Sequence, residues 1–143
     1  MILPDLNLLI YSINDQSPYH KKAKIWWESC LSSNETVAFP WVVLLGFLRI
    51  TTSHRIFPNP IKPLEAWNII DLWMERSVTR ILNPGVNHFQ ILRTLMLDNG
   101  TGGNLTTDAH LAALAIEYNG VLYTADNDFK RFAPLKWVNP LKR

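Results

Sequence analysis

Short β-prone segments alternate with longer segments of helical periodicity along the whole chain, and this alternation limits the possible fold more than any other feature. Parallel strands need a crossover connection, which is usually a helix, whereas antiparallel strands can be joined by a tight turn. The segments expected to form strands are 1–5, 36–39, 78–82, 121–124 and 136–138. The pattern therefore predicts an α/β fold with a mostly parallel sheet.

The connecting segments carry helix signals. Ser17 followed by Pro18 indicates a helix start, with Ser17 as the N-cap, and Pro40 can likewise open a helix behind the second strand. The proline-rich segment 57–63 is expected to be a loop. Apolar residues at helical spacing predict helices around 18–31, 41–50, 66–74, 89–96 and 109–116.

Length and composition indicate one folded unit. The chain has 143 residues, of which 48% are hydrophobic, which is the size of one compact domain spanning 1–143. Only 18% of the residues are charged and there are six tryptophans, so the whole length is expected to fold. The tryptophans either fill the core or partly cover a partner surface. The single cysteine, Cys30, excludes an internal disulfide and a cysteine-based zinc cluster.

The N-terminus lacks the basic and long apolar regions of a secretory signal, and no stretch is apolar enough to span a membrane. A soluble, cytoplasmic protein without membrane contact is therefore expected. The net charge of +2 is compatible with an RNA partner but does not demand one.

Three aspartates are expected at the carboxyl ends of the strands, where functional groups collect in open α/β sheets. Asp5 closes the first strand, Asp126 follows the fourth, and Asp108 lies in the first turn of the alanine-rich helix, with Asp128 as a fourth carboxylate nearby. Carboxylates packed together repel one another unless a cation neutralises them, and oxygen ligands select Mg²⁺ or Mn²⁺. Such an ion can activate water for attack on a phosphodiester.

Each aspartate also has a structural explanation. Asp108 suits the N-terminus of a helix because of the helix dipole, and Asp126 and Asp128 are typical turn residues. Asp5 could be a hydrogen-bonded structural carboxylate. The residues alone exclude neither these structural roles nor a metal site.

The remaining polar residues give weaker signals. Arg49 is a candidate contact for a phosphate or for a carboxylate of a partner. The four histidines show no paired metal-ligand spacing, and none is assigned to catalysis.

Four motifs in series resemble the PIN-domain family. They are Pro4-Asp5-Leu6-Asn7, Gly46-Phe47-Leu48-Arg49, the segment 107–115 (TDAHLAALA) and the segment 124–129 (TADNDF), and they cover nearly the full chain. The chain looks most similar to the VapC toxins of VapBC toxin-antitoxin systems. The resemblance implies a PIN-like three-layer α/β/α fold with a small, mostly parallel sheet, a Mg²⁺- or Mn²⁺-dependent ribonuclease acting on tRNA, rRNA or mRNA, a homodimer, and a VapB-type antitoxin as inhibitor.

The same resemblance implies roles for individual residues. Asp5, Asp108 and Asp126 carry over as metal ligands, Asp128 as a neighbouring catalytic acid, and Asn7 and Thr124 as supports of the ligands. One departure stands out, because the family usually has a glutamate in the helix after the second strand and this chain has Gly46 there. Gly46 could reflect close packing or room for a partner's side chain.

Two functions remain open on the sequence. The first is a toxin of a type II toxin-antitoxin system that cleaves RNA by metal-activated water. The second is a catalytically weakened PIN-like module that binds RNA or an antitoxin without cutting, as the missing glutamate would suggest. An aspartyl phosphoacceptor is a third class, but the lysine and acidic pair that it needs are not found.

Overall fold

A computed structural model describes residues 1–142 and contains a five-stranded sheet in which every strand is parallel to its neighbours. The strand order is β3-β2-β1-β4-β5. The α/β fold with a parallel sheet is thus confirmed. The strands are β1 (Ile2–Pro4), β2 (Val37–Pro40), β3 (Thr79–Leu82), β4 (Val121–Tyr123) and β5 (Trp137–Val138).

The central strand β1 is buried along its whole length, and its Ile2 pairs with Val37 on one side and Val121 on the other. Pro4 is the last residue of β1, so its missing backbone donor falls at the end of the ladder, where it is tolerated.

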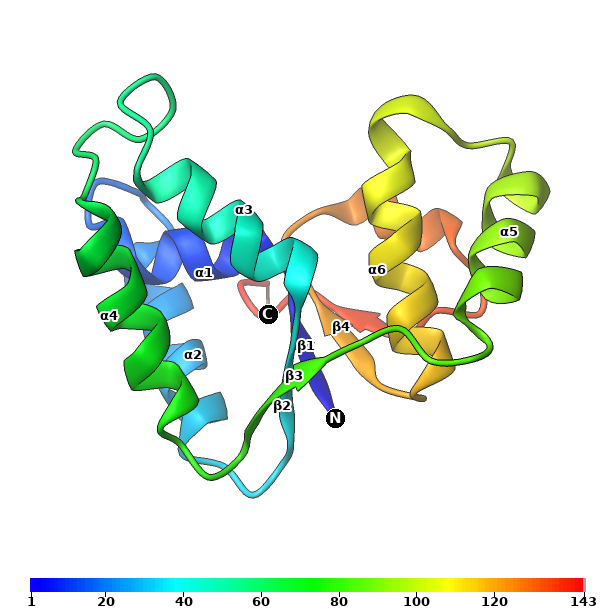
Figure 1. The fold of residues 1–143 in the computed structure, drawn as a ribbon, viewed down its shortest axis with the longest axis horizontal. Helices are drawn as coiled ribbons and strands as arrows, with labels where there is room; N and C mark the ends of the chain where they lie inside the picture. Colours follow the sequence, from blue (N-terminus) through cyan, green and yellow to red (C-terminus); the bar gives the residue numbers. More distant parts are fainter. Residues whose placement is uncertain (143) are drawn as a thin grey trace.

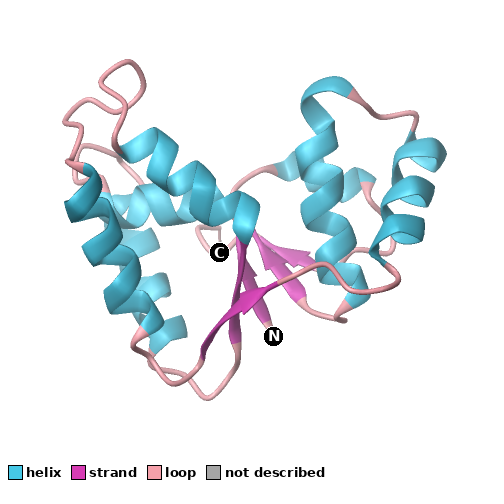
Figure 2. Cartoon of the chain, viewed as in Figure 1, coloured by secondary structure: helices cyan, strands magenta, loops and turns pink. Residues whose placement is uncertain are grey.

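The sheet lies between two layers of helices (Figures 1 and 2). Helices α1 to α4 cover one face, and α5 and α6 cover the other. This is the expected three-layer α/β/α arrangement. The helices are α1 (Leu6–Ile13), α2 (His20–Leu31), α3 (Trp41–Thr51), α4 (Pro63–Met74), α5 (His88–Asn99) and α6 (Thr106–Glu117).

Helix α1 is absent from the elements that the sequence pattern predicts. Its segment LNLLIYSI does carry apolar residues at helical spacing, at positions 6, 9, 10 and 13, but it is only eight residues long and directly follows the first strand. The structure shows what starts it: the Asp5 side chain accepts a hydrogen bond from the Leu6 N–H (2.7 Å) and acts as the N-cap.

The start of α2 was predicted two residues too early. The helix begins at His20 rather than at Pro18, and Tyr19 is its N-cap residue. The Ser17 hydroxyl accepts a hydrogen bond from the Tyr19 N–H (3.1 Å), which closes a turn before the helix instead of capping it.

An aromatic cluster fills the layer between the sheet and α1–α4. Trp27 and Trp73 meet edge to face, and Trp73 stacks on Phe39 and contacts Phe47. The expectation that tryptophans fill the core is confirmed for Trp27 and Trp73, whereas Trp41 and Trp67 are each 47% exposed, and whether a partner covers them stays a prediction. Among residues 1–142, no helix is both long and apolar enough to cross a membrane.

Candidate metal centre

The predicted acidic residues meet at the carboxyl ends of β1 and β4. Asp5 directly follows β1, and Asp126 lies just past the end of β4. In the sheet, β2 lies on one side of β1 and β4 lies on the other. The strand order therefore reverses direction at β1, next to β4. Ligands bind at such points in open α/β sheets.

Asp5 is a buried carboxylate with hydrogen bonds to both of its oxygens. It is 9% exposed, its Oδ1 accepts from the Leu6 N–H (2.7 Å), and its Oδ2 accepts from the Thr124 hydroxyl (2.7 Å). Burial raises the pKa of Asp5 above its usual range, although both hydrogen bonds act in the opposite direction, and the charge of Asp126 raises it further.

Thr124 connects the acidic residues of the two strands. Its buried hydroxyl donates to Asp5, accepts from the Asp126 N–H (3.0 Å) and accepts from the Asn7 amide (3.4 Å). The Asn7 Oδ1 in turn accepts from the Ala125 N–H (3.4 Å). Asn7 and Thr124 therefore fix the position of the loop after β4 relative to Asp5.

Asp108 lies in the first turn of α6, as predicted, and is half-buried. Its pKa is raised to about 6, first by burial and then by the charges of Asp5, Asp126 and Asp128, while Arg131 lowers it. A carboxyl group is raised in this way when other carboxylates are close enough to repel it. The four acidic residues therefore form one electrostatic cluster.

Asp126 and Asp128 also have the structural role that their sequence suggests. Asp126 is the N-cap of a short 3₁₀ helix, Asn127–Arg131, and its Oδ1 accepts from the Asp128 N–H (2.8 Å). Asp128 is exposed and lies 3.7 Å from the Arg131 guanidinium. Arg131 was not singled out from the sequence, although its spacing of three residues from Asp128 is a usable signal.

Gly46 is explained by close packing between α1 and α3. A Cβ atom at this position would lie 2.5 Å from the Leu6 Cδ2 atom, so a side chain could enter only if Leu6 moved. The residue in contact here, Leu6, is the one that follows Asp5.

Arg49 is not part of the acidic cluster. It lies in the last turn of α3, exposed to solvent, and forms no ion pair with any residue between 1 and 142.

The chemistry of the cluster fits a hard divalent cation, because all of its side-chain ligands are carboxylate oxygens and they repel one another. The arrangement is not preformed, however. Within residues 1–142, no three histidine, cysteine, aspartate or glutamate side chains lie close enough together to hold a metal ion. The carboxylates would have to approach one another on binding.

A groove of about 430 Å³ opens beside Asp5. It lies between α1, the end of α3 and the loop after it, and its walls are mostly apolar. It could not be predicted from the sequence, because its lining comes from three separate segments: Asp5, Leu6, Asn7, Ile10, Tyr11, Asn14, Ile50, Ile56, Phe57 and Pro58.

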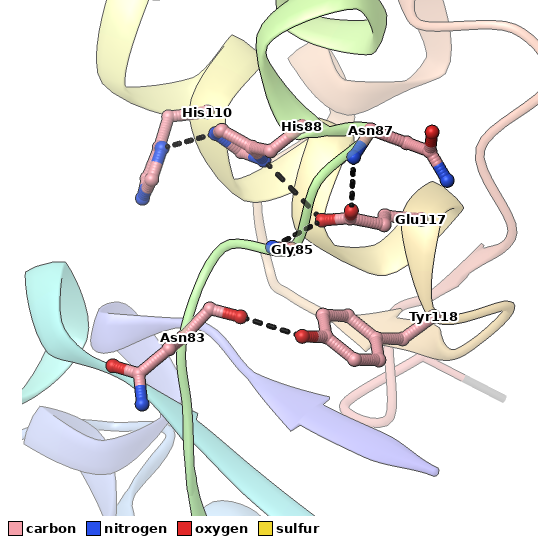
Figure 3. A network of polar contacts seen from close by, with 7 residues as sticks. All are labelled: Asn83, Gly85, Asn87, His88, His110, Glu117 and Tyr118. Carbon is pink, nitrogen blue, oxygen red and sulfur yellow. Dashed lines mark hydrogen bonds and ion pairs between the residues drawn. The ribbon is translucent and has the colours of Figure 1, made fainter.

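A second polar network ties α5 to α6 (Figure 3). The His88 Nε2 and His110 Nδ1 atoms are 2.9 Å apart, although the spacing of these residues gave no reason to pair them. The Glu117 carboxylate accepts from the N–H groups of Gly85 and Asn87 (both 2.9 Å). A side chain at Gly85 would collide with Glu117, so the loop between β3 and α5 needs glycine there.

Comparisons with known proteins agree with this architecture. The model of the PIN domain family matches residues 2–135. The chain is 37% identical over 142 residues to Ribonuclease VapC33 of Mycobacterium tuberculosis, with 99% of each protein covered. It is 38% identical over 140 residues to Ribonuclease VapC37 of the same organism, covering 98% of this chain and 97% of the relative.

A solved structure of VapBC2 from Rickettsia felis, bound to a DNA fragment from its promoter, has the same fold. The TM-score is 0.71 at 22% sequence identity, with 97% of this chain and 98% of that chain covered.

Proposed function

Because the chain belongs to the PIN-domain family, and within it to the VapC ribonucleases, we propose that it is the toxin of a type II toxin-antitoxin system and a metal-dependent endoribonuclease. The observation that carries the proposal is the Thr124 hydroxyl, which donates to Asp5 Oδ2 (2.7 Å) and accepts from the Asp126 N–H (3.0 Å), so that the acidic residues after β1 and β4 lie side by side. Acidic side chains from three segments of the chain lie near the edge of the sheet where such folds bind ligands.

Asp5, Asp108 and Asp126 are the proposed metal ligands, with Mg²⁺ or Mn²⁺ as the cation. When bound, the cation supplies activation of water and neutralisation of charge on the phosphodiester. Asp128 is the proposed neighbouring acid, and its ion pair with Arg131 limits how far its carboxylate can move.

The supporting residues hold Asp5 in place and oppose the effect of burial on its pKa. The Thr124 hydroxyl and the Leu6 N–H each donate to one oxygen of Asp5, which favours the charged form that a cation needs. Since each carboxylate oxygen has a second lone pair, both oxygens remain able to bind a cation. Asn7 holds the loop that carries Asp126 through its contacts with Thr124 and Ala125.

The proposal extends to the partners and to the cell compartment. We assign residues 1–143 to one PIN domain, and we propose an RNA substrate, a VapB-type antitoxin, a homodimer and a cytoplasmic location. Exposed apolar side chains support protein partners, because Val86 is 97% and Phe89 is 78% exposed.

A second candidate function is the catalytically weakened PIN-like module that binds RNA or an antitoxin without cutting it. Gly46 favours it, because this helix position supplies no carboxylate and, among residues 1–142, the aspartates are not preformed as a metal site.

The test is incubation of the purified protein with a pool of tRNA and mRNA in Mg²⁺, in Mn²⁺ and in EDTA. Asp5→Asn and the half-buried Asp108→Asn are the test variants, and Asp71→Asn, an exposed carboxylate of α4, is the matched control. We expect discrete fragments that require metal, disappear in both test variants and persist in the control. RNA that stays intact in every lane would favour the binding module.

A further inference from the structure

We infer that the groove beside Asp5 is a subsite for one unpaired nucleobase of the RNA, next to the bond that is cut. This inference rests on the proposed function, because it places the scissile phosphate at the acidic cluster. It adds a specificity-determining site that lies outside the cluster itself.

The groove is continuous with the acidic cluster through two residues. Asp5 belongs to the cluster and Asn7 donates to Thr124 beside it; both also line the groove, which then extends along α1 to Tyr11 and Asn14. A phosphate beside Asp5 would therefore have its own nucleoside, or the adjacent one, within reach of the groove.

The lining suits the flat apolar face and polar edge of a base. Ile10, Ile56 and the half-buried ring of Tyr11 provide contact area above the buried Phe57, and unpaired RNA bases commonly stack on aromatic side chains. The Asn14 Oδ1 accepts from the Gln16 N–H (3.1 Å), which leaves the amide nitrogen of Asn14 to donate to a base edge. A volume of about 430 Å³ lies within the range of small-ligand sites.

Two exposed arginines that are neighbours in sequence of lining residues favour a nucleic acid. Arg49 and Arg55 directly precede the lining residues Ile50 and Ile56, and both are exposed. Neither forms an ion pair with another residue in the described part of the chain. Two unpaired guanidinium groups favour the phosphates that flank a bound base and disfavour a basic peptide.

The test compares binding of two fluorescein-labelled single-stranded RNAs of eight nucleotides, one of uridines and one of abasic ribose units with the same phosphates. Binding is measured by fluorescence anisotropy in EDTA with the Asp108→Asn protein, so the result does not depend on cleavage. Ile56→Asp, at a side chain that is 54% exposed, puts a carboxylate in the groove; Ile25→Asp, 60% exposed on α2, is the control.

We expect the base-containing RNA to bind about tenfold more tightly than the abasic RNA, as one stacked base allows. Ile56→Asp should bring this ratio close to one, and Ile25→Asp should leave it unchanged. A ratio near one without any groove substitution, or a ratio that Ile56→Asp does not change, would overturn the inference. Unchanged RNA discrimination with loss of antitoxin binding in Ile56→Asp would instead assign the groove to a peptide.

If the protein is not a ribonuclease, the result differs from the one expected when only the base subsite is wrong. In that case the RNA pool stays intact with metal, whatever the anisotropy ratio is. A tenfold ratio without cleavage would keep the base subsite and assign it to a binding module.

Discussion

Asp108 is the residue whose pKa reflects both burial and the repulsion among the carboxylates of the cluster. Its pKa of about 6 lies above the ordinary value of 3.8, so the unfolded chain releases this proton at lower pH than the folded protein does. The folded state is therefore penalised as the pH rises from about 4 to about 6, and the penalty stays constant above that range.

The first prediction concerns the stability of the metal-free protein against pH. Between pH 4 and pH 7 in EDTA, the free energy of unfolding of Asp108→Asn should rise relative to wild type by about 1 kcal/mol, a value reduced for solvent screening of a half-exposed group. Urea unfolding at each pH measures it. Asp71→Asn serves as the control, and equal pH profiles for wild type and Asp108→Asn would contradict the cluster.

Gly46 allows a second prediction at the residue scale. Alanine is favoured over glycine inside a helix by about 1 kcal/mol, whereas overpacking costs about 1–3 kcal/mol. Because the added Cβ would meet Leu6, we expect Gly46→Ala to lower the free energy of unfolding by about 1 kcal/mol in wild type and to raise it in a Leu6→Ala background. Additive effects of the two substitutions in chemical denaturation would show that Leu6 is not the obstacle.

At the scale of elements, the loop between β3 and α5 is anchored by the end of α6. Glu117 accepts two backbone N–H groups of this loop, and the Tyr118 hydroxyl donates to the Asn83 carbonyl (2.7 Å; Figure 3). The loop is thus held rigidly although its Val86 side chain is almost fully exposed.

The third prediction tests this anchor. Glu117→Gln replaces one acceptor with an amide that faces a backbone N–H, which should cost about 1–3 kcal/mol of stability. Hydrogen exchange at Gly85 and Asn87 should become faster, while exchange in β1 should accelerate only as far as global stability falls. Glu28→Gln, at an exposed position on α2, is the control. Unchanged exchange at both amides would show that Glu117 does not anchor the loop.

Most helices and strands could be predicted from patterns of residues close together in the sequence. The five strands and the helices from α2 to α6 follow from turn residues and periodicity, although boundaries such as the start of α2 moved by two residues. Helix α1 was missed although the apolar residues at 6, 9, 10 and 13 have helical spacing, because the segment is short and its N-cap Asp5 was interpreted only as the end of a strand.

At the scale of the whole molecule, parallel strands bring Asp5 and Asp126 to one edge, so their proximity follows from topology before any coordinates are known. The groove and the pair of His88 and His110 could not be predicted, because each depends on how helices pack rather than on spacing along the chain. The same holds for Gly46, whose neighbour Leu6 belongs to the unpredicted helix.

The central claim is that Asp5, Asp108 and Asp126 together bind the cation on which RNA cleavage depends. The most direct test is titration of the purified protein with Mn²⁺, followed by electron paramagnetic resonance, for wild type, Asp108→Asn and the control Asp71→Asn. The account predicts that wild type and Asp71→Asn bind Mn²⁺ equally and that Asp108→Asn binds it at least about tenfold more weakly. Equal Mn²⁺ affinity in all three proteins, with RNA still cleaved by wild type, would contradict it.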